Sequence, residues 1–308
     1  MTIDVLIVLQ ARMGSSRLPG KVLSDLGGMP MLEFQLRRLF PVASVLDATI
    51  VVATSEHERD DPVAELATGL NIRTIRGSED DVLGRFAIAA EAIPSETIVR
   101  LTGDCPLTDP TLVAEAVSLH QAAHADYTSN VLPRSYPKGL DVEVFSAKAL
   151  QRAAAEATAP FEREHVTPFL YRRPDRFRLA NLFSGQDLGR ERWTVDTADD
   201  ITRVRGIVAQ LADPVGLRWQ EILTEIGQEF TASEGELWLR PVGIETPGQC
   251  PWVRTWVAEV DGREVGSVSV ESGAGDPQFV YRVPTAQVDE ATAALAGLLI
   301  GDQQIRID

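Results

Sequence analysis

Cysteine is nearly absent from this chain: among 308 residues there are only two, Cys105 and Cys250. Two cysteines so far apart in sequence cannot build a disulfide framework or a zinc cluster, and their scarcity fits a reducing compartment. Histidine is scarce as well. The histidines are His57, His120, His124 and His165, and their spacing matches no metal-binding motif.

Long apolar runs and an N-terminal targeting pattern are also missing. The apolar run Ile3–Leu9 is too short to span a membrane. No basic region precedes an apolar run and a small-residue cleavage site, as a secretory signal requires. We therefore expect a soluble, cytoplasmic protein with no membrane partner.

Positive charge is the third shortage. The chain carries 29 Lys and Arg residues against 45 Asp and Glu residues, which gives a formal net charge of −16. An acidic protein repels nucleic acid at long range, so we expect no nucleic-acid partner. A local cluster of cations is an exception to this composition and is therefore informative.

Such a cluster follows the first apolar run. Residues 10–21 read Gln-Ala-Arg-Met-Gly-Ser-Ser-Arg-Leu-Pro-Gly-Lys, which places Arg12, Arg17 and Lys21 in a loop of small residues. Small residues let backbone N–H groups approach phosphate oxygens, while the cations neutralise them. The loop is neither a P-loop, because Lys21 is not followed by Ser or Thr, nor a GxGxxG motif. We predict a polyphosphate site here rather than an ordinary charged surface loop.

Strand-like and helix-like segments alternate through the first part of the chain. Apolar and β-branched runs predict strands at Asp4–Leu9, Thr49–Ala53, Asn71–Ile75 and Thr97–Leu101, and helical spacing predicts helices at Met31–Phe40, Pro62–Gly69, Asp80–Ala92 and Asp109–His124. This alternation predicts an α/β fold with a mostly parallel nucleotide-binding sheet and helices on both faces. Ligands bind beyond the carboxyl ends of such strands, where the Arg12 loop and Asp104 both lie.

The pattern changes in the later part of the chain. We predict strands at Gly139–Phe145, Arg178–Phe183 and Arg192–Val195, and helices at Ala147–Glu156, Glu162–Tyr171 and Asp199–Leu211. From about Gly235 the sequence predicts a small C-terminal α+β unit, with strands Trp256–Val260 and Val265–Val270 around an Asp261-Gly262 turn and a final helix Gln287–Leu299. We therefore expect two domains, residues 1–230 and 235–308, joined through Glu229–Glu234.

Seven segments, taken together, resemble a known family. They are Leu9–Lys21, Val51–Ser55, Gly77–Leu83, Leu101–Leu107, Gly139–Phe145, Glu164–Pro168 and Val195–Asp200. These segments resemble the cytidylyltransferases that make CMP-activated sugar acids, such as CMP-sialic acid, CMP-pseudaminic acid and CMP-Kdo, and most of all the spore-coat polysaccharide biosynthesis group. The resemblance implies a Mg²⁺-dependent enzyme that transfers CMP from CTP to a sugar acid, releases pyrophosphate and acts in surface polysaccharide or glycoconjugate biosynthesis.

The resemblance also implies a nucleotide site at the first loop and the neighbouring strand ends. Arg12, Lys21 and Asp104 take its catalytic roles. The nucleotide-binding residues that it implies are Gln10, Ala11, Arg12, Ser15, Ser16, Arg17, Lys21, Thr54, Ser55, Arg76, Gly77 and Gly103. Among them, Thr54 and Ser55 with the Arg76-Gly77 turn would read the edge of the pyrimidine. The alternative for these positions is an ordinary strand-to-helix turn.

Two aspartates are the candidate magnesium ligands. Attack on an α-phosphorus needs positioning, charge neutralisation and a metal, and Mg²⁺ commonly takes one or two carboxylates with phosphates and waters. Asp104 and Asp196 each end a predicted strand on the crevice side, and the resemblance places metal-binding aspartates at both positions. The alternatives are a turn residue for Asp104 and a helix N-cap for Asp196.

The acceptor should lie against the second half of the domain. Asp141, Glu143 and His165 are the acceptor-binding candidates there. A histidine has a pKa suited to accepting a proton from the attacking hydroxyl. The alternative for His165 is a structural role in an amphipathic helix.

The C-terminal unit weakly resembles the first strands of an acetyltransferase domain, at Leu239–Pro241, Trp256–Glu259 and Glu264–Val268. It lacks the Gly-rich loop and helix that would hold the pyrophosphate of acetyl-CoA. We expect a degenerate fragment that serves packing or dimerisation, which leaves a homodimer as an open expectation.

Three other functions stay open at this point. The first is a nucleotidyltransferase with another NTP or acceptor. The second is a glycosyltransferase, in which Asp141-Val142-Glu143 would imitate the usual carboxylate pair, although three loop cations favour a triphosphate over a diphosphate sugar. The third is a non-catalytic nucleotide-binding protein, favoured if Asp104 or Asp196 cannot reach a metal.

Overall fold

The computed structural model describes residues 3–184 and 188–227, together with the backbone of seven strands between residues 237 and 307. The strands of the first part are β1 (Ile3–Gln10), β2 (Asp25–Leu26), β3 (Met29–Pro30), β4 (Thr49–Ser55), β5 (Arg73–Gly77), β6 (Ser95–Thr102), β7 (Tyr127–Ser129), β8 (Glu143–Ser146) and β9 (Leu179–Leu182). The helices are α1 (Met31–Val45), α2 (Asp61–Gly69), α3 (Val82–Ala92), α4 (Pro110–Ala122), α5 (Ala147–Glu156), α6 (Pro160–His165), α7 (Pro168–Tyr171), α8 (Ala198–Val208) and α9 (Trp219–Glu225).

The central sheet has the strand order β9-β7-β8-β6-β1-β4-β5. Strand β1 pairs in parallel with β4 and β6, β4 pairs in parallel with β5, and β7 pairs in parallel with β9. Strand β8 runs antiparallel to both of its neighbours. The predicted mostly parallel α/β sheet is therefore confirmed, and the carboxyl ends of β1, β4 and β6 meet at one edge.

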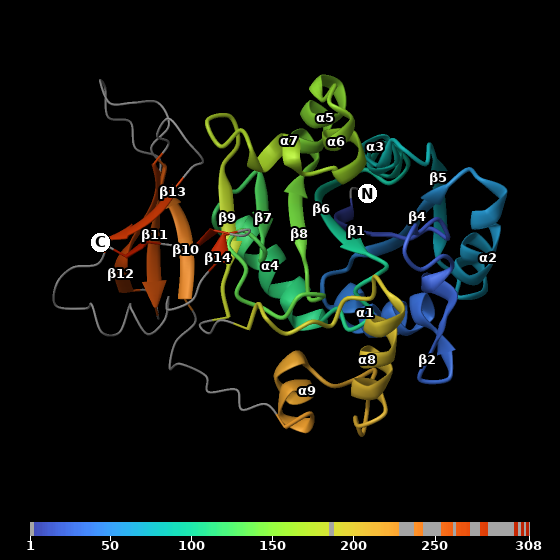
Figure 1. Cartoon of the computed structure of the whole chain (residues 1–308). Coiled ribbons are helices and arrows are strands. Elements are labelled where there is room, and N and C mark those ends of the chain that lie inside the picture. The colour runs from blue at the N-terminus through green and yellow to red at the C-terminus, as the bar shows by residue number, and fades with distance from the viewer. Residues whose placement is uncertain are drawn as a thin grey trace.

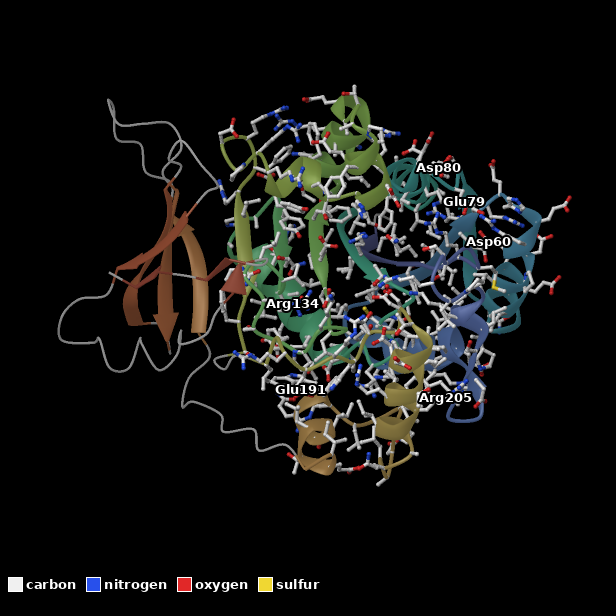
Figure 2. All side chains as sticks on the ribbon, in the orientation of Figure 1. Asp60, Glu79, Asp80, Arg134, Glu191 and Arg205 are labelled. Carbon is white, nitrogen blue, oxygen red and sulfur yellow. The ribbon has the colours of Figure 1, made fainter. Side chains whose placement is uncertain are left out.

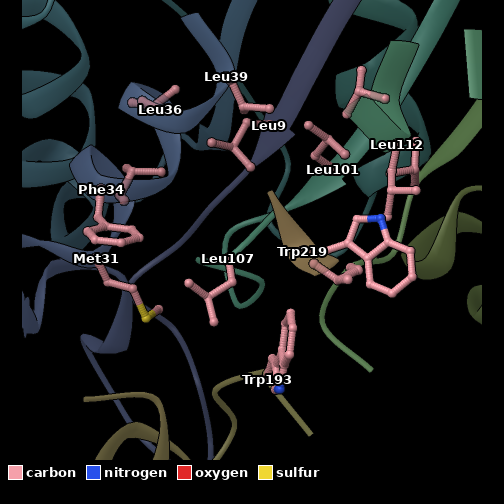
Figure 3. Packing of buried hydrophobic residues seen from close by; sticks show 14 of the residues in the cluster. Leu9, Met31, Phe34, Leu36, Leu39, Leu101, Leu107, Leu112, Trp193 and Trp219 are labelled. Atoms are coloured by element: carbon pink, nitrogen blue, oxygen red, sulfur yellow. The ribbon is translucent and has the colours of Figure 1, made fainter. Parts of the chain in front are cut away.

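Helices cover the sheet on both faces (Figure 1). On one face, Val5, Ile7 and Leu9 of β1 pack in a core with α1, α4, α8 and α9, part of which is drawn in Figure 3. On the other face, Leu6 and Val8 pack in a second core with α3, α5 and α7. Alternate residues of β1 thus enter opposite cores, as the two-residue period of a strand requires.

Three expected elements differ from the structure. The strand predicted at Gly139–Phe145 begins only at Glu143, because the side chain of Asn130 takes the hydrogen bonds of Leu140 O and Val142 N before it. The helix predicted over Glu162–Tyr171 is broken into α6 and α7, because Val166 leaves the helical conformation with a φ of 70° and Pro168, which has no backbone N–H, begins α7 at its first position. The strand predicted at Arg192–Val195 is wrong. This segment makes an isolated bridge to Lys138 and otherwise hydrogen-bonds to loops, including a bond from Val195 N to Asp104 O.

The C-terminal strands extend the sheet at β9. Strand β10 (Leu237–Val242) pairs antiparallel with β9, and β11 (Arg254–Val260), β12 (Arg263–Glu271), β13 (Gln278–Arg282) and β16 (Arg306–Ile307) follow in order. A separate pair is formed by β14 (Leu299–Ile300) and β15 (Gln303–Gln304).

The two strands of the expected hairpin are confirmed as the antiparallel pair β11 and β12. The Asp261-Gly262 turn, the Glu229–Glu234 joint and residues 287–298 of the expected final helix lie outside the described residues. Leu299, the last residue of that expected helix, instead begins strand β14 and pairs with Gln304. The domain boundary and the acetyltransferase-like origin of this unit stay predictions.

A buried arginine fastens the segment after α8 to the rest of the domain. Arg38 of α1 is fully buried and donates to the backbone carbonyls of Thr108, Pro214, Val215 and Leu217. Asp109 accepts a hydrogen bond of 2.6 Å from Trp219 N at the start of α9. These contacts hold α9 against the core beside the turn that follows β6.

Replacing this arginine should destabilise the domain. Arg38→Met would leave buried carbonyls without donors, and we expect the free energy of unfolding to fall by about 3 kcal/mol. Urea denaturation at neutral pH measures the change. The control is Arg37→Met at the exposed neighbouring position, where the pair with Glu33 is worth about 0.5 kcal/mol. Equal effects of the two substitutions would contradict this account.

Candidate active site

The floor of the site is the edge where β1, β4 and β6 end. Ala11 N donates to Ala53 O, and Gly103 N donates to Gln10 O at 2.8 Å. A Cβ atom on Gly103 would lie 3.0 Å from the Cβ of Ala11, so this approach depends on two small residues. Backbone from three strands is thereby brought close enough to line one pocket.

The loop after β1 is fixed in place by a buried carboxylate. Asp60 is 1% exposed and accepts hydrogen bonds from Met13 N, Ser55 N and the Ser55 hydroxyl. Gly20 N donates back to Met13 O, and Gly20 has a φ of 72°, a conformation that favours glycine. The loop therefore folds back on itself and brings Lys21 over the strand edge.

Lys21 lies between the two candidate metal ligands. Its Nζ donates to Val195 O at 2.6 Å and to Asp196 Oδ1 at 3.1 Å, and lies 3.6 Å from Asp104 Oδ2. Arg17 Nη2 is 3.2 Å from the same Asp196 oxygen. The two aspartates, 92 positions apart in sequence (196 minus 104), thus face one ammonium group. Within the described residues, no third acidic, histidine or cysteine side chain joins them to form a larger ligand cluster.

The N-cap alternative for Asp196 is not what the structure contains. Thr197 caps α8, in a capping box with Asp200, and this leaves the Asp196 side chain directed to cations. Burial acts to raise the pKa of Asp196, but the hydrogen bond and charge of Lys21, together with Arg17 and Arg192, outweigh it and lower that pKa. Asp196 is therefore a carboxylate at neutral pH.

A first pocket of about 370 Å³ opens above this edge. It is lined by the first loop, the ends of β1 and β6, the start of α3 and part of α6. The residues include Gln10, Ala11, Arg12, Gly14, Ser15, Ser16, Arg17, Lys21, Val82, Arg85, Arg100, Thr102, Gly103, Asp104, Glu164 and His165. Most of the nucleotide-binding residues expected from the sequence are thus brought to one pocket, although their roles stay predictions.

A second pocket of about 250 Å³ adjoins the first and shares Arg100, Thr102 and His165 with it. Asp141 and Glu143 lie in its lining, as do Tyr127, Thr167 and Tyr171. The three acceptor-binding candidates from the sequence therefore meet at one cavity. His165 is the last residue of α6 and exposed, and its ring contacts that of Phe161.

Charges in the second pocket are matched in pairs. Arg134 makes a bidentate pair with Asp141, at 2.5 and 2.8 Å. Glu143 accepts hydrogen bonds from Arg100, Tyr127 and Thr167. Arg100 Nε also donates to Gln10 Oε1 at 3.0 Å, which fixes this guanidinium between the two pockets.

Four of the expected nucleotide-binding residues line neither pocket. Ser55 bonds to Asp60, and Thr54 is buried in β4. Arg76 donates to Ser55 O, His57 O and Asp61. Gly77 lies beneath Arg85, where a Cβ atom would come within 2.8 Å of the Arg85 Cγ. Their roles in reading the base stay predictions.

The comparisons with known proteins agree with this geometry. A family model described as cytidylyltransferase matches residues 6–201, which is well over half of the chain. The chain belongs to the cytidylyltransferase family. This membership favours nucleotidyl transfer over the glycosyltransferase alternative.

Relatives of this cytidylyltransferase occur in bacteria and archaea. An uncharacterized protein of Methanocaldococcus jannaschii is 40% identical over 63% of this chain and 78% of its own length. The spore coat polysaccharide biosynthesis protein SpsF of Bacillus subtilis is 32% identical over 75% of this chain and 97% of its own length. A 3-deoxy-manno-octulosonate cytidylyltransferase of Geobacter sulfurreducens is 34% identical over 37% of this chain and 44% of its own length.

Solved structures show the same fold. A cytidylyltransferase from Leptospira borgpetersenii superimposes with a TM-score of 0.69 at 30% identity and covers 73% of this chain and 94% of its own. A CMP:2-keto-3-deoxy-manno-octonic acid synthetase complexed with CTP gives a TM-score of 0.51 at 20% identity, covers 67% of this chain and 99% of its own, and supports the fold alone. Among the described residues of this cytidylyltransferase, no helix is long and apolar enough to cross a membrane.

Sequence reasoning missed Arg85 and Arg100, which both line the first pocket. Arg100 had a visible signal, because it interrupts the apolar run Thr97–Leu101 at a position that alternates with Thr102 and Asp104. Arg85 had none in the sequence: only its burial on α3 marks it, since a buried cation without a hydrogen-bond partner is unusual.

The stability that Asp200 gives to the segment around Asp196 should depend on pH. The hydrogen bond from Arg192 holds the pKa of Asp200 well below its usual range, so Asp200 contributes stability that is fully present above about pH 4. This contribution is lost as the pH falls through the lowered folded-state pKa. Asp200→Asn should therefore cost about 2 kcal/mol at pH 7, and the difference from wild type should shrink steadily below about pH 4.

The measurement is urea denaturation at a series of pH values, with Asp199→Asn as the control. Asp199 is exposed in the same turn of α8, and its substitution should change stability by less than about 0.5 kcal/mol at each pH. An Asp200→Asn effect that is constant from pH 7 to pH 3 would show that the charge of Asp200 is not what stabilises the segment.

Proposed function

We propose that this cytidylyltransferase transfers CMP from CTP to a sugar acid, with release of pyrophosphate and with Mg²⁺ as cofactor. One observation carries the proposal. The Lys21 ammonium lies against both Asp104 and Asp196 at the edge of a pocket whose wall is the loop of Arg12 and Arg17. Cations for a triphosphate and carboxylates for a metal therefore lie together.

The loop supports triphosphate binding. Lys21 and Arg17 are positioned to neutralise phosphate oxygens, and small residues at Gly14, Ser15 and Ser16 allow a close backbone approach. Neutralising the β- and γ-phosphates makes pyrophosphate a better leaving group, because negative charge accumulates on it during the reaction. The partners of Lys21 are side-chain oxygens and one carbonyl, which a metal-bound nucleotide can replace.

Asp104 and Asp196 suit a magnesium ion. Two carboxylates that share one cation can share another, and Mg²⁺ completes its coordination with substrate phosphates and waters. When bound, the ion would withdraw charge from the phosphates and orient them. The two carboxylates would hold it above the strand edge.

The second pocket suits the acceptor. Arg100 pairs with Glu143 but lines both pockets, whereas Arg134 pairs with Asp141 and lines neither pocket. We infer that Arg100 binds the carboxylate of the sugar acid. Asp141 and Glu143 would accept hydrogen bonds from its hydroxyls, and Tyr127 and Thr167 keep Glu143 in place.

The reaction follows from this arrangement. The acceptor hydroxyl oxygen attacks the α-phosphorus of CTP, a new P–O bond forms, and the bond to the β-phosphate oxygen breaks. The hydroxyl proton passes to a ring nitrogen of His165, which lines both pockets. The product is a CMP-sugar acid, and the relatedness to a spore coat polysaccharide protein supports a place in surface polysaccharide or glycoconjugate biosynthesis.

A nucleotide screen tests CTP use directly. With Mg²⁺ present, CTP should raise the melting temperature of the protein more than ATP, GTP or UTP, because a ligand stabilises the native state by mass action. Pyrophosphate release with CTP and a panel of sugar acids then identifies the acceptor. Equal stabilisation by all four nucleotides would count against the proposal.

Removing the Lys21 charge should weaken the nucleotide site. Lys21→Met should lower kcat/KM for CTP by about 10- to 100-fold, because charge-assisted contacts contribute about 1.5–3 kcal/mol each. Lys148→Met, at an exposed position on α5, is the control and should leave kcat/KM unchanged. Unaltered kinetics of Lys21→Met at both low and saturating CTP would remove Lys21 from the site.

Substituting either aspartate should impair metal use. Asp104→Asn and Asp196→Asn should each lower turnover by about 100-fold and raise the Mg²⁺ concentration for half-maximal rate. Asp25→Asn, at an exposed position in β2, serves as the control. Full activity of the wild-type enzyme in excess chelator would overturn the role of the metal.

A further inference from the structure

Arg85 is a buried cation whose side chain makes no hydrogen bond or ion pair within residues 3–184 and 188–227. Its side chain is 2% exposed, and Nε and Nη1 are buried without a hydrogen-bond partner within the described residues. Arg38 is equally buried, but it donates to four backbone carbonyls. A structural arginine of this fold is therefore satisfied, whereas Arg85 is not.

The charge of Arg85 persists despite its burial. Desolvation and the neighbouring Arg12 guanidinium lower the pKa of Arg85 to about 10, so the side chain stays protonated at neutral pH. An unpaired buried charge costs folding free energy. Such a cost is retained in a folded protein where the group serves a ligand, and Arg85 lines the first pocket.

The fold makes room for this side chain. Gly77 ends β5 directly beneath it, and a Cβ atom there would lie 2.8 Å from the Arg85 Cγ. Since the buried nitrogens bond to nothing, the guanidinium can turn toward a ligand without losing a hydrogen bond. Arg85 is thus a cation with space and unused donors.

The surroundings of Arg85 disfavour a phosphate. The charged groups that act on it are Arg12 and the carboxylates of Asp60, Glu79 and Asp81. Figure 2 labels Asp60 and Glu79 on one side of the domain and Arg134 nearer its middle. Glu79 pairs with Arg12 and Arg59, and Asp81 pairs with Arg163, so the charges around Arg85 are already balanced. Arg85 therefore does not need an anion to offset a cluster of positive charge, and a neutral ligand with acceptor atoms suits it. The phosphate cations Lys21 and Arg17 gather instead around Asp196.

The neutral part of a nucleotide is its base. Cytosine presents two adjacent acceptors, O2 and N3, whereas N3 of uracil carries a proton and donates. A guanidinium has only donors, so it can satisfy both cytosine atoms but only one of the two uracil atoms. A donor-only group at the base therefore distinguishes CTP from UTP.

We propose that Arg85 is the residue that selects cytosine, by donating hydrogen bonds to O2 and N3 of the base. This inference rests on the proposed use of CTP and adds the residue that enforces it. Gly77 takes part indirectly, because it provides the space in which Arg85 lies.

The test compares Arg85→Met with the wild-type enzyme in calorimetric binding of CTP, UTP and CMP. Arg85→Met should weaken CTP and CMP binding at least 10-fold and UTP binding less than threefold, so that the CTP-to-UTP preference collapses. Without nucleotide, its melting temperature should equal or exceed that of wild type, because an unsatisfied charge is gone. Arg152→Met, at an exposed position on α5, is the control and should change none of these values.

Arg85→Lys keeps the positive charge but loses the paired N–H donors of the guanidinium. It also provides a test if the methionine variant does not fold. It should retain nucleotide binding while losing most of the preference for CTP. Equal losses of CTP and UTP binding, with CMP unaffected, would assign Arg85 to the β- and γ-phosphates and overturn the proposal. An unchanged CTP preference in either variant would also overturn it. A wild-type enzyme without any preference for CTP would instead contradict the proposed function itself.

Discussion

One ammonium group connects the parts of the chain on which this site depends. Lys21 Nζ contacts Asp104, Asp196 and Val195 O, and so joins the first loop, the turn after β6 and the segment before α8. A backbone hydrogen bond from Val195 N to Asp104 O also joins the segment before α8 to the turn after β6. Two carboxylates held this close to each other would repel without the cation between them. Lys21 therefore offsets the negative charge of both carboxylates.

The acidic composition of the chain makes the cations of the first pocket more important for binding an anionic ligand. With a net charge of −16, the protein as a whole repels anionic ligands, and the cations of the first pocket have to overcome that background locally. They do so by concentration: Arg12, Arg17, Lys21, Arg85 and Arg100 all line one cavity. Carboxylates orient four of these cations: Glu79 pairs with Arg12, Asp196 with Arg17 and Lys21, and Glu143 with Arg100.

Much of the fold was predictable from local pattern. Strands such as β1 and β6 are apolar runs of strand length, and helices such as α5 have caps and spacing that identify them. The failures have a common cause, which is that long-range contacts decide the structure there. Arg192–Val195 has the composition of a strand, but its backbone partners are the loops at Lys138 and Asp104, which no local pattern reveals. Likewise, motif order pointed to Asp104 and Asp196, whereas Arg85 became visible only once burial and missing partners could be measured.

The wall shared by the two pockets has a consequence for how the enzyme works through its cycle. Arg100, Thr102 and His165 border both cavities. Under the proposed function, nucleotide and acceptor are bound at the same time, and CMP passes directly from one to the other without an intermediate on the protein. The product would then occupy parts of both cavities and compete with each substrate, so its accumulation should slow successive turnovers.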